Sequence, residues 1–265
     1  MAATPRPPAT VVAPPAWRAI DFISDLHLTE GTPRTFAQWS AFLHETRADA
    51  IFILGDLFEA WVGDDSRHEG FEARGAATLS SAAQQRPIFF MVGNRDFLLG
   101  AEMLAACGMQ ALEDPTLLRA FGEKVLLAHG DALCLDDLPY QQLRRVVRDP
   151  DWQRSFLARP LPERRAMARA LRDESERHKS TLKAGEWIDV DPTAAVNELK
   201  AAGTTTLVHG HTHRPASEEI APGYWRHVLS DWDLDGTGPG RAEVMRWQGG
   251  PFMRLSPDEA IRRGP

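Results

Sequence analysis

Five short apolar stretches of this chain each end in a cluster of Asp, Asn or His, and this repetition constrains the fold more than any other feature. The clusters are Asp25-Leu26-His27, Gly55-Asp56, Gly93-Asn94-Arg95-Asp96, His129-Gly130-Asp131 and His211-Thr212-His213. The stretches before them are apolar and often β-branched, as is typical of buried strands. Neighbouring strands of one sheet lie about 5 Å apart, so polar groups at their common edge can converge. One such cluster alone is an ordinary turn, but five together predict a metal centre.

Helices are expected between the early strands. The strands are expected within residues 17–28, 48–61, 87–100, 124–137 and 204–215. Residues 35–47 and 71–85 show the spacing of amphipathic helices and separate the first three strands. This alternation predicts an α/β fold in which the sheet is layered between helices.

The ligand types in the clusters narrow the chemistry. Three carboxylate or amide oxygens and four imidazoles, without a thiolate, suit divalent ions of intermediate hardness such as Mn²⁺, Fe²⁺ or Zn²⁺. Seven ligands exceed what one ion needs, whereas they fit two ions about 3.5–4 Å apart that share one carboxylate. Two-metal sites of this kind typically promote in-line displacement at phosphorus, so this is the reaction that the pattern favours.

The composition is that of a globular protein, since 43% of the 265 residues are hydrophobic and 25% are charged. No apolar run approaches the roughly 18 residues of a membrane span, and the N-terminus lacks the apolar core of a signal peptide. The net charge of −7 argues against a general nucleic-acid binder. Cys107 and Cys134 match no metal or disulfide spacing, which suits a reducing cytosol. Residues 1–16 are rich in Pro and Ala and are expected to form a disordered tail before one domain over 17–265.

Residues 140–183 interrupt the alternation of strands and helices. They contain twelve basic and six acidic residues, a net charge of +6 inside an acidic chain. Pro162 near its start and Gly185 after its end are expected to bracket a helix. Such a basic and apolar helical cap would fit an amphiphile with a diphosphate head, or an anionic membrane surface. The alternative is a solvated helical hairpin that packs on the core.

The order D-x-H, GD, GN, H and GHTH resembles the signature of the calcineurin-like metallophosphoesterases, from Ile20 to the end of the fold. The longer stretches "ISDLHL", "LGDLFEAWVGDD", "GNRDFLLG", "HGDALCLDD" and "HGHTHRP" resemble the members that cleave UDP-2,3-diacylglucosamine in lipid A synthesis. This resemblance implies a sandwich of two mixed β-sheets flanked by helices. It also implies a helical lid inserted at about residues 139–185.

The resemblance also implies site residues. The implied metal ligands are Asp25, His27, Asp56, Asn94, His129, His211 and His213, with Asp56 bridging two ions, most simply Mn²⁺. The implied catalytic residues are Asn94, Arg95 and His129. The implied substrate contacts are Asn94, Arg95, Asp137, Ser175, Lys179, Lys183 and His211, with Leu182 as the alternative to the two lysines. His209 matches no ligand of the signature and is expected to pack at the end of its strand.

Arg95 separates this chain from many relatives, which carry a histidine after the asparagine of GN. That histidine protonates an alkoxide leaving group, whereas an arginine cannot donate a proton near pH 7. A leaving phosphate has a pKa of about 6 and can depart unprotonated beside a fixed positive charge. Arg95 therefore favours cleavage of a pyrophosphate over an alkyl monoester. The alternative is that Arg95 merely pairs with Asp96.

The expected activity is hydrolysis of UDP-2,3-diacylglucosamine by water attack at the α-phosphorus, which gives UMP and 2,3-diacylglucosamine 1-phosphate. The expected location is peripheral, on the cytoplasmic face of the inner membrane of a Gram-negative bacterium. One alternative is a soluble nucleotide pyrophosphatase or phosphodiesterase of the same superfamily, which the basic segment disfavours. The other is a metal-free scaffold on this fold, which the complete ligand set disfavours.

Overall fold

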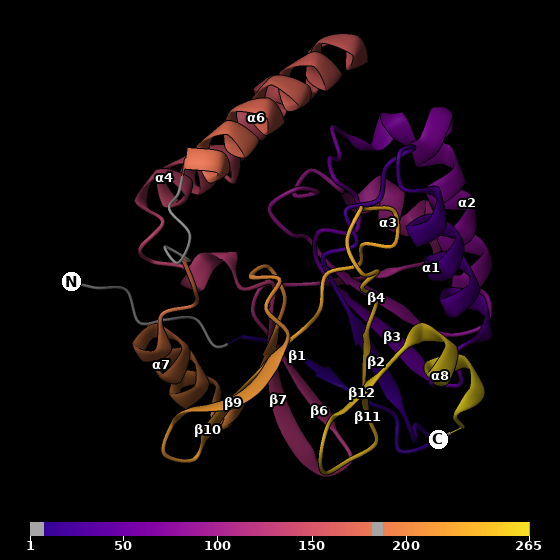
Figure 1. The fold of residues 1–265 in the computed structure, drawn as a ribbon, viewed down its shortest axis with the longest axis vertical. Helices are drawn as coiled ribbons and strands as arrows, with labels where there is room; N and C mark the ends of the chain where they lie inside the picture. Colours follow the sequence, from indigo (N-terminus) through magenta and orange to yellow (C-terminus); the bar gives the residue numbers. More distant parts are fainter. Residues whose placement is uncertain (1–7, 182–187, 265) are drawn as a thin grey trace.

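The computed structural model describes residues 8–181 and 188–264, and the side chains of these residues outside 173–181. Two six-stranded sheets pack face to face, and helices cover the outer faces (Figure 1). The first sheet has the order β1 (Ala9–Val12), β6 (Thr116–Ala120), β7 (Glu123–Ala128), β8 (Thr206–His209), β10 (Tyr224–Val228) and β9 (Ala216–Ala221). The second has the order β12 (Met253–Leu255), β11 (Val244–Trp247), β2 (Ile20–Ile23), β3 (Ala50–Leu54), β4 (Ile88–Met91) and β5 (Gln110–Leu112). Both sheets mix parallel and antiparallel pairs.

The strands alternate their side chains between two cores. Phe52 and Leu54 of β3 lie between the sheets, together with Leu127 of β7 and Val208 of β8. Ile51 and Ile53 of β3 point the other way, into a core that the helices close. Since successive residues of a strand face opposite sides, strands buried on both faces are continuously apolar, as these are.

Most of the helices lie in the connections between strands. Their bounds are α1 (Pro33–Glu45), α2 (Gly70–Ala83), α3 (Ala101–Cys107), α4 (Leu138–Val147), α5 (Pro150–Leu157), α6 (Leu161–Thr181), α7 (Pro192–Ala202) and α8 (Pro257–Arg262). Short 3-10 turns span η1 (Asp64–His68) and η2 (Asp131–Leu133). Helices α1, α2, α3 and α8 cover the second sheet, whereas α7 covers the first. Several begin at a capping side chain; Asp191, for example, accepts the backbone N–H of Ala194 at 2.7 Å at the start of α7.

The predicted elements agree with this architecture in kind, with two corrections. The sandwich of two mixed sheets flanked by helices is confirmed. However, the five strands that carry the polar clusters do not share one sheet edge, because β2, β3 and β4 belong to the second sheet and β7 and β8 to the first. The carboxyl ends of β3 and β7 still meet, since His129 after β7 lies 2.9 Å from the carbonyl oxygen of Leu54 in β3. The clusters therefore converge across two sheets.

The prediction of a disordered tail over residues 1–16 is wrong for β1. Ala9–Val12 pairs in parallel with β6 at the edge of the first sheet. Thr10, Val11 and Val12 are β-branched and suit a strand, and an edge position tolerates the prolines that flank them. Residues 1–7 of that predicted tail lie outside the described residues.

Helices α4, α5 and α6 occupy the segment between β7 and β8, and α6 extends away from the sheets (Figure 1). We refer to α4–α6 as the helical segment. As predicted, α6 begins next to Pro162, whereas Gly185 lies outside the described residues. The buried guanidinium of Arg164 attaches α6 to the sandwich through both carboxylate oxygens of Asp65 and the carbonyl oxygen of Val62. Gly63 makes room for it, because a side chain there would collide with Arg164.

Candidate metal centre

All seven predicted ligands lie just beyond strands β2, β3, β4, β7 and β8, and the structure brings them together. Five of them have a left-handed backbone, with φ of 56° at Asp25, 48° at His27, 52° at Asp56, 67° at His211 and 52° at His213. Among the described residues other than glycine, only Phe121 also has a positive φ. Such conformations cost free energy and concentrate at functional sites, where the surrounding structure enforces them.

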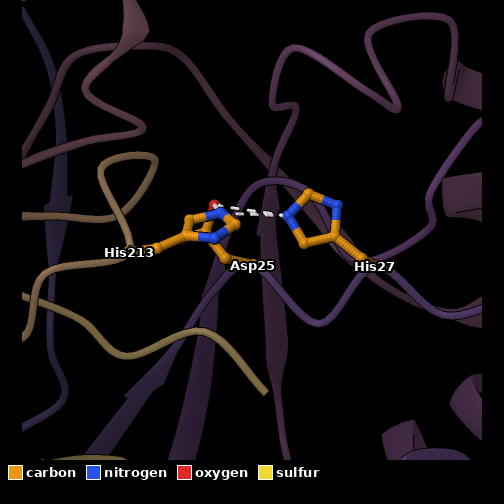
Figure 2. Close-up of side chains that lie close together, drawn as sticks. All are labelled: Asp25, His27 and His213. Atoms are coloured by element: carbon orange, nitrogen blue, oxygen red, sulfur yellow. Dashed lines mark hydrogen bonds and ion pairs between the residues drawn. The ribbon is translucent and has the colours of Figure 1, made fainter. Parts of the chain in front are cut away.

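One group of possible ligands consists of Asp25, His27 and His213, whose side chains converge in Figure 2. The Nε2 atoms of the two histidines are 3.1 Å apart. Oδ1 of Asp25 lies 3.4 Å from Nε2 of His213 and 4.0 Å from Nε2 of His27. Three ligand atoms therefore surround a space the size of one ion.

A second group consists of Asp25, Asp56 and His129, all buried. The two oxygens of Asp56 face opposite ways: Oδ1 lies 3.8 Å from Nε2 of His129, and Oδ2 lies 3.9 Å from Nε2 of His27. The carboxylate thus reaches both groups, which is the geometry that a bridging ligand needs. Asp25, rather than Asp56, is the residue that belongs to both groups.

Asn94 and His211 extend the second group. Oδ1 of Asn94 lies 3.0 Å from Nε2 of His129 and 2.8 Å from Nδ1 of His211. The amide oxygen and the two imidazoles therefore face one another, as ligands of a common ion do.

Asp25 provides a test of whether these residues fit a cation. Its Oδ2 accepts the backbone N–H of His211 at 2.8 Å, whereas its buried Oδ1 accepts no hydrogen bond within the described part of the chain. A buried carboxylate oxygen without a partner is costly unless a cation satisfies it. Ligand atoms about 2.1 Å from one ion lie roughly 3–4 Å from each other, which matches the separations in both groups. The residues fit divalent ions.

The carboxylates make the site attractive to positive charge. Burial lowers the pKa of His129, but Asp56, Asp131 and Asp25 outweigh it and raise the pKa to about 9. Burial and the neighbouring His129 instead lower the pKa of His211 to about 3. The two pKa values thus differ because carboxylates outweigh burial at His129, whereas burial dominates at His211 and the neighbouring His129 adds to it.

Asp96 holds two of the ligand loops in place. This buried carboxylate accepts the backbone N–H groups of Gly93 at 2.7 Å and Leu57 at 2.8 Å. Its oxygens are therefore committed to the backbone, and the described ion pairs place the guanidinium of Arg95 against Glu59, at 3.6 Å. The alternative in which Arg95 merely pairs with Asp96 is not the arrangement found.

His209 is buried at the end of β8, so the prediction that it packs there is confirmed. Its Nδ1 lies 2.9 Å from the carbonyl oxygen of Gly210, and burial lowers its pKa to about 4. Gly130 has φ of 115° and packs so close that a side chain there would collide with the His209 ring.

The predicted substrate contacts are placed only in part. Asp137 caps α4 by accepting the backbone N–H of Tyr140 at 3.1 Å. Ser175 and Lys179 belong to α6, in the part where side chains are outside the described set. Lys183 and its alternative Leu182 lie outside the described residues altogether.

Two acidic residues beside the site, Glu59 and Asp131, received no role from the sequence. Glu59 lies 2.9 Å from Nδ1 of His27. Asp131 pairs with Arg144 of α4 at 2.8 Å and accepts the hydroxyl of Tyr140. Glu59 resembles a surface acid in the sequence, and the only signal was its place three residues after Asp56.

A cluster of candidate metal ligands at the edge of a β-sandwich defines a class of protein, and comparison with known families gives the same class. The pattern of the family described as calcineurin-like phosphoesterase matches residues 19–215. The chain belongs to this family, whose members use divalent metals for hydrolysis.

More specific relatives share most of the chain. A UDP-2,3-diacylglucosamine hydrolase of Chromobacterium violaceum is 47% identical over 221 residues, which cover 81% of this chain and 90% of that protein. The enzyme of the same name from Aromatoleum aromaticum is 44% identical over 240 residues, which cover 88% of this chain and 95% of that protein. A third, from Coxiella burnetii, is 42% identical, with 89% and 93% covered.

Proposed function

We propose that this protein hydrolyses UDP-2,3-diacylglucosamine to UMP and 2,3-diacylglucosamine 1-phosphate, a step of lipid A biosynthesis. The observation that carries the proposal is the identity of 47% over most of the chain to a hydrolase of that name, combined with the convergence of the seven predicted ligands. Water attacks the α-phosphorus, a new P–O bond forms there, and the bond from that phosphorus to the bridging oxygen breaks.

The seven residues predicted from the sequence would hold two divalent ions, most simply Mn²⁺, with Asp56 as the shared ligand. When bound, such ions supply a hydroxide near neutral pH and neutralise the phosphate oxygens. Oδ1 of Asn94 lies 3.0 Å from Nε2 of His129. These two residues and His211 would orient the phosphate.

Arg95 has the role of stabilising the departing phosphate. Its backbone N–H donates to Oδ1 of Asp56 at 2.8 Å, so the residue is fixed beside the proposed bridging ligand. Its buried Nε has no hydrogen-bond partner among the described atoms, which leaves a donor for substrate. A fixed positive charge is worth most where charge develops on the leaving group.

The helical segment has the surface of a lid for an acylated substrate. Of the eight large hydrophobic side chains that are exposed among the described residues, six lie between residues 135 and 171. They are Leu135, Leu138, Leu143, Val146, Leu157 and Leu171. The concentration of exposed apolar side chains in this one part of the chain supports a binding role for it, here for acyl chains. Asp137, Ser175, Lys179 and Lys183 complete the proposed substrate contacts, with Leu182 as the alternative to the two lysines.

The same surface supports a peripheral position on the cytoplasmic face of the inner membrane. Within the described ranges, no helix combines the length and the apolar character needed to cross a bilayer. Leu138→Ser should weaken co-sedimentation with anionic vesicles. Val12→Ser is the matched control, because Val12 is 66% exposed, Leu138 is 65% exposed, and Val12 lies in β1, outside the helical segment. Equal sedimentation of both variants and the wild type would exclude this surface.

The reaction is tested with purified protein and Mn²⁺ on UDP-2,3-diacylglucosamine, UDP-glucose and ADP-ribose. We expect rapid turnover only of the acylated substrate, and label from H₂¹⁸O in UMP. Comparable rates on all three substrates would favour the soluble nucleotide pyrophosphatase. Absence of turnover with Mn²⁺ bound would exclude both enzymes.

A further inference from the structure

The carboxylate of Glu59 faces three cationic or potentially cationic groups from three parts of the chain. Glu59 lies in the loop after β3, and its side chain is only 11% exposed. Its Oε2 lies 2.9 Å from Nδ1 of His27. Its Oε1 lies 3.2 Å from Nε of Arg172 in α6 and 3.6 Å from Nη1 of Arg95. Glu59 is therefore the one described carboxylate that contacts a predicted metal ligand, the predicted leaving-group arginine and the helical segment.

The contact with His27 decides which imidazole nitrogen is free. The 2.9 Å contact is an ion-pair contact without hydrogen-bond geometry, and the negative charge of the carboxylate favours the proton on Nδ1, so the lone pair remains on Nε2. That Nε2 is the atom that faces Oδ1 of Asp25, Oδ2 of Asp56 and Nε2 of His213. Glu59 therefore selects the tautomer whose lone pair points into the metal centre.

Backbone hydrogen bonds fix the position of Glu59 relative to His27. The N–H of His27 donates to the carbonyl oxygen of Asp56 at 3.0 Å, and the N–H of Glu59 donates to the carbonyl oxygen of Leu28 at 3.3 Å. The loops after β2 and β3 are thus bonded to each other in both directions. The carboxylate approaches the imidazole because of this rigid pairing and does not depend on a mobile surface side chain.

The contact with Arg95 orients a group that has few other partners. The Arg95 backbone is fixed by Asp56, but Nε of its guanidinium has no described hydrogen-bond partner. Glu59 at 3.6 Å is the ion pair described for this guanidinium. Removal of the carboxylate would release Arg95 and change the tautomer of His27 together.

We propose that Glu59 is a positioning residue that fixes the Nδ1–H tautomer of His27 for metal binding and aligns Arg95 toward the reacting phosphate. This inference rests on the proposed two-metal pyrophosphatase, and it adds a residue outside the ligand set. Partners of this kind typically contribute 10–100-fold to metal affinity or activity.

The first experiment measures metal affinity without substrate. Mn²⁺ is titrated into Glu59→Gln and wild type in competition with a fluorescent chelator, and we expect a 10–100-fold weaker affinity for one of the two ions in the variant. Glu102→Gln is the control, because Glu102 forms a comparable pair with Arg67 at 3.2 Å on the exposed surface and should bind Mn²⁺ as wild type does. Unchanged affinity for both ions in Glu59→Gln would overturn the proposal.

The second experiment observes the tautomer, which a loss of negative charge alone would not change. In ¹⁵N-histidine-labelled, metal-free protein at high pH, the neutral His27 ring of the wild type should carry its proton on Nδ1. In Glu59→Gln this assignment should become mixed or the resonance should shift, and Glu59→Asp should lie between the two. An identical His27 spectrum in all three proteins would refute the tautomer role; if Glu59→Gln fails to fold, Glu59→Asp alone decides.

Failure of the proposed function would look different. In that case the wild type itself would leave UDP-2,3-diacylglucosamine intact, while the Mn²⁺ affinities of Glu59→Gln and wild type would still differ.

The coupling between Glu59 and Arg95 is tested by kinetics. At saturating Mn²⁺, Glu59→Gln should have a lower kcat than wild type, and this deficit should disappear when both proteins also carry Arg95→Ala. A deficit of the same size in both backgrounds would show that Glu59 does not act through Arg95.

Discussion

The strand-end site and the helical segment are built by opposite means. The site is held by buried carboxylates, backbone hydrogen bonds and a left-handed backbone at five predicted ligands. The helical segment exposes five large apolar side chains, and it is attached to the sandwich through arginines and through apolar side chains such as the buried Phe156. Its attachments are Arg144 to Asp131, Arg148 to the carbonyl oxygen of Gly93, Arg164 to Asp65, Arg165 to Glu69 and Arg172 to Glu59.

This contrast separates chemistry from recognition. Groups that must meet a transition state within a few tenths of an ångström are placed by the two sheets and their packed core. The groups proposed to accept acyl chains lie on helices that are attached to the sandwich by side-chain contacts. Variants at the strand ends should therefore lower the rate on every phosphodiester, whereas variants of the helical attachment should affect only the lipid substrate.

The largest effect is expected at Asp56. Asp56→Ala removes the oxygen that faces His27 and the oxygen that faces His129, so turnover should fall by at least about 10³-fold on the lipid substrate and on bis(p-nitrophenyl) phosphate alike. Metal content and thermal unfolding are measured in parallel, and the variant should fold with less than two ions bound. Near-normal activity with two ions present would contradict the bridging role.

A smaller loss is expected at Arg95. Arg95→Ala should reduce kcat/KM on the diphosphate by about 2–4 kcal/mol of transition-state stabilisation. Arg95→His should not restore this rate, but it should improve hydrolysis of an alkyl phosphodiester, whose leaving group needs a proton. The four rate constants are measured at equal metal content. If Arg95→Ala cleaves the diphosphate as fast as wild type, the leaving-group argument is wrong.

The attachment of the helical segment is tested at Arg164. Arg164→Leu leaves the buried carbonyl oxygen of Val62 without its donor, so we expect a loss of about 1–3 kcal/mol in unfolding free energy. KM for the acylated substrate should rise on the order of tenfold. In the variant, substrate binding must also bring α6 back to the sandwich, and this consumes about 1.4 kcal/mol of the binding free energy. The rate on bis(p-nitrophenyl) phosphate should stay unchanged.

Arg154→Leu serves as the control for Arg164→Leu. Arg154 pairs with Asp151 on the exposed surface of α5, and such a pair contributes little. The control should match wild type in unfolding and in KM. A loss of rate on the small diester in Arg164→Leu would mean that the two regions are not separable.

The smallest effect is expected at His209, which lies inside the site region without facing the ligand groups. Burial lowers its pKa to about 4, so it is neutral at pH 7 and a neutral glutamine is a fair replacement. His209→Gln should keep activity within roughly threefold of wild type, whereas His211→Gln should lose about 100-fold or more. Equal inactivity of the two folded variants would show that the three histidines were divided wrongly.

The sequence predicted the strands that carry the site better than the strands that complete the sheets. Residues such as Ile51-Phe52-Ile53 are apolar throughout because they are buried on both faces, and this pattern is visible without a structure. β9 reads Ala-Ser-Glu-Glu-Ile-Ala and is largely exposed at a sheet edge, so its sequence resembles a loop. Similarly, the prolines around β1 suggested disorder, whereas pairing with β6 overrides that local preference.

Within the site, residue types and spacing predicted the groups that converge, but they did not predict their surroundings. Asp25 and His213 are separated by most of the chain, and only the motif order connected them. Glu59 and Asp131 lie within or beside those motifs, yet whether an acid binds metal, caps a loop or pairs with arginine depends on distances across two sheets. Those distances are a property of packing, which sequence spacing does not encode.

The left-handed backbone at Asp25, His27, Asp56, His211 and His213 has a consequence for how such a protein can change over time. Each of these residues occupies a conformation that costs about 1–3 kcal/mol for an ordinary side chain and almost nothing for glycine. A library of random variants selected only for resistance to heat should therefore accumulate glycine at these positions and lose activity as it gains robustness. Selection for turnover must therefore retain Asp and His at these five positions against their replacement by glycine.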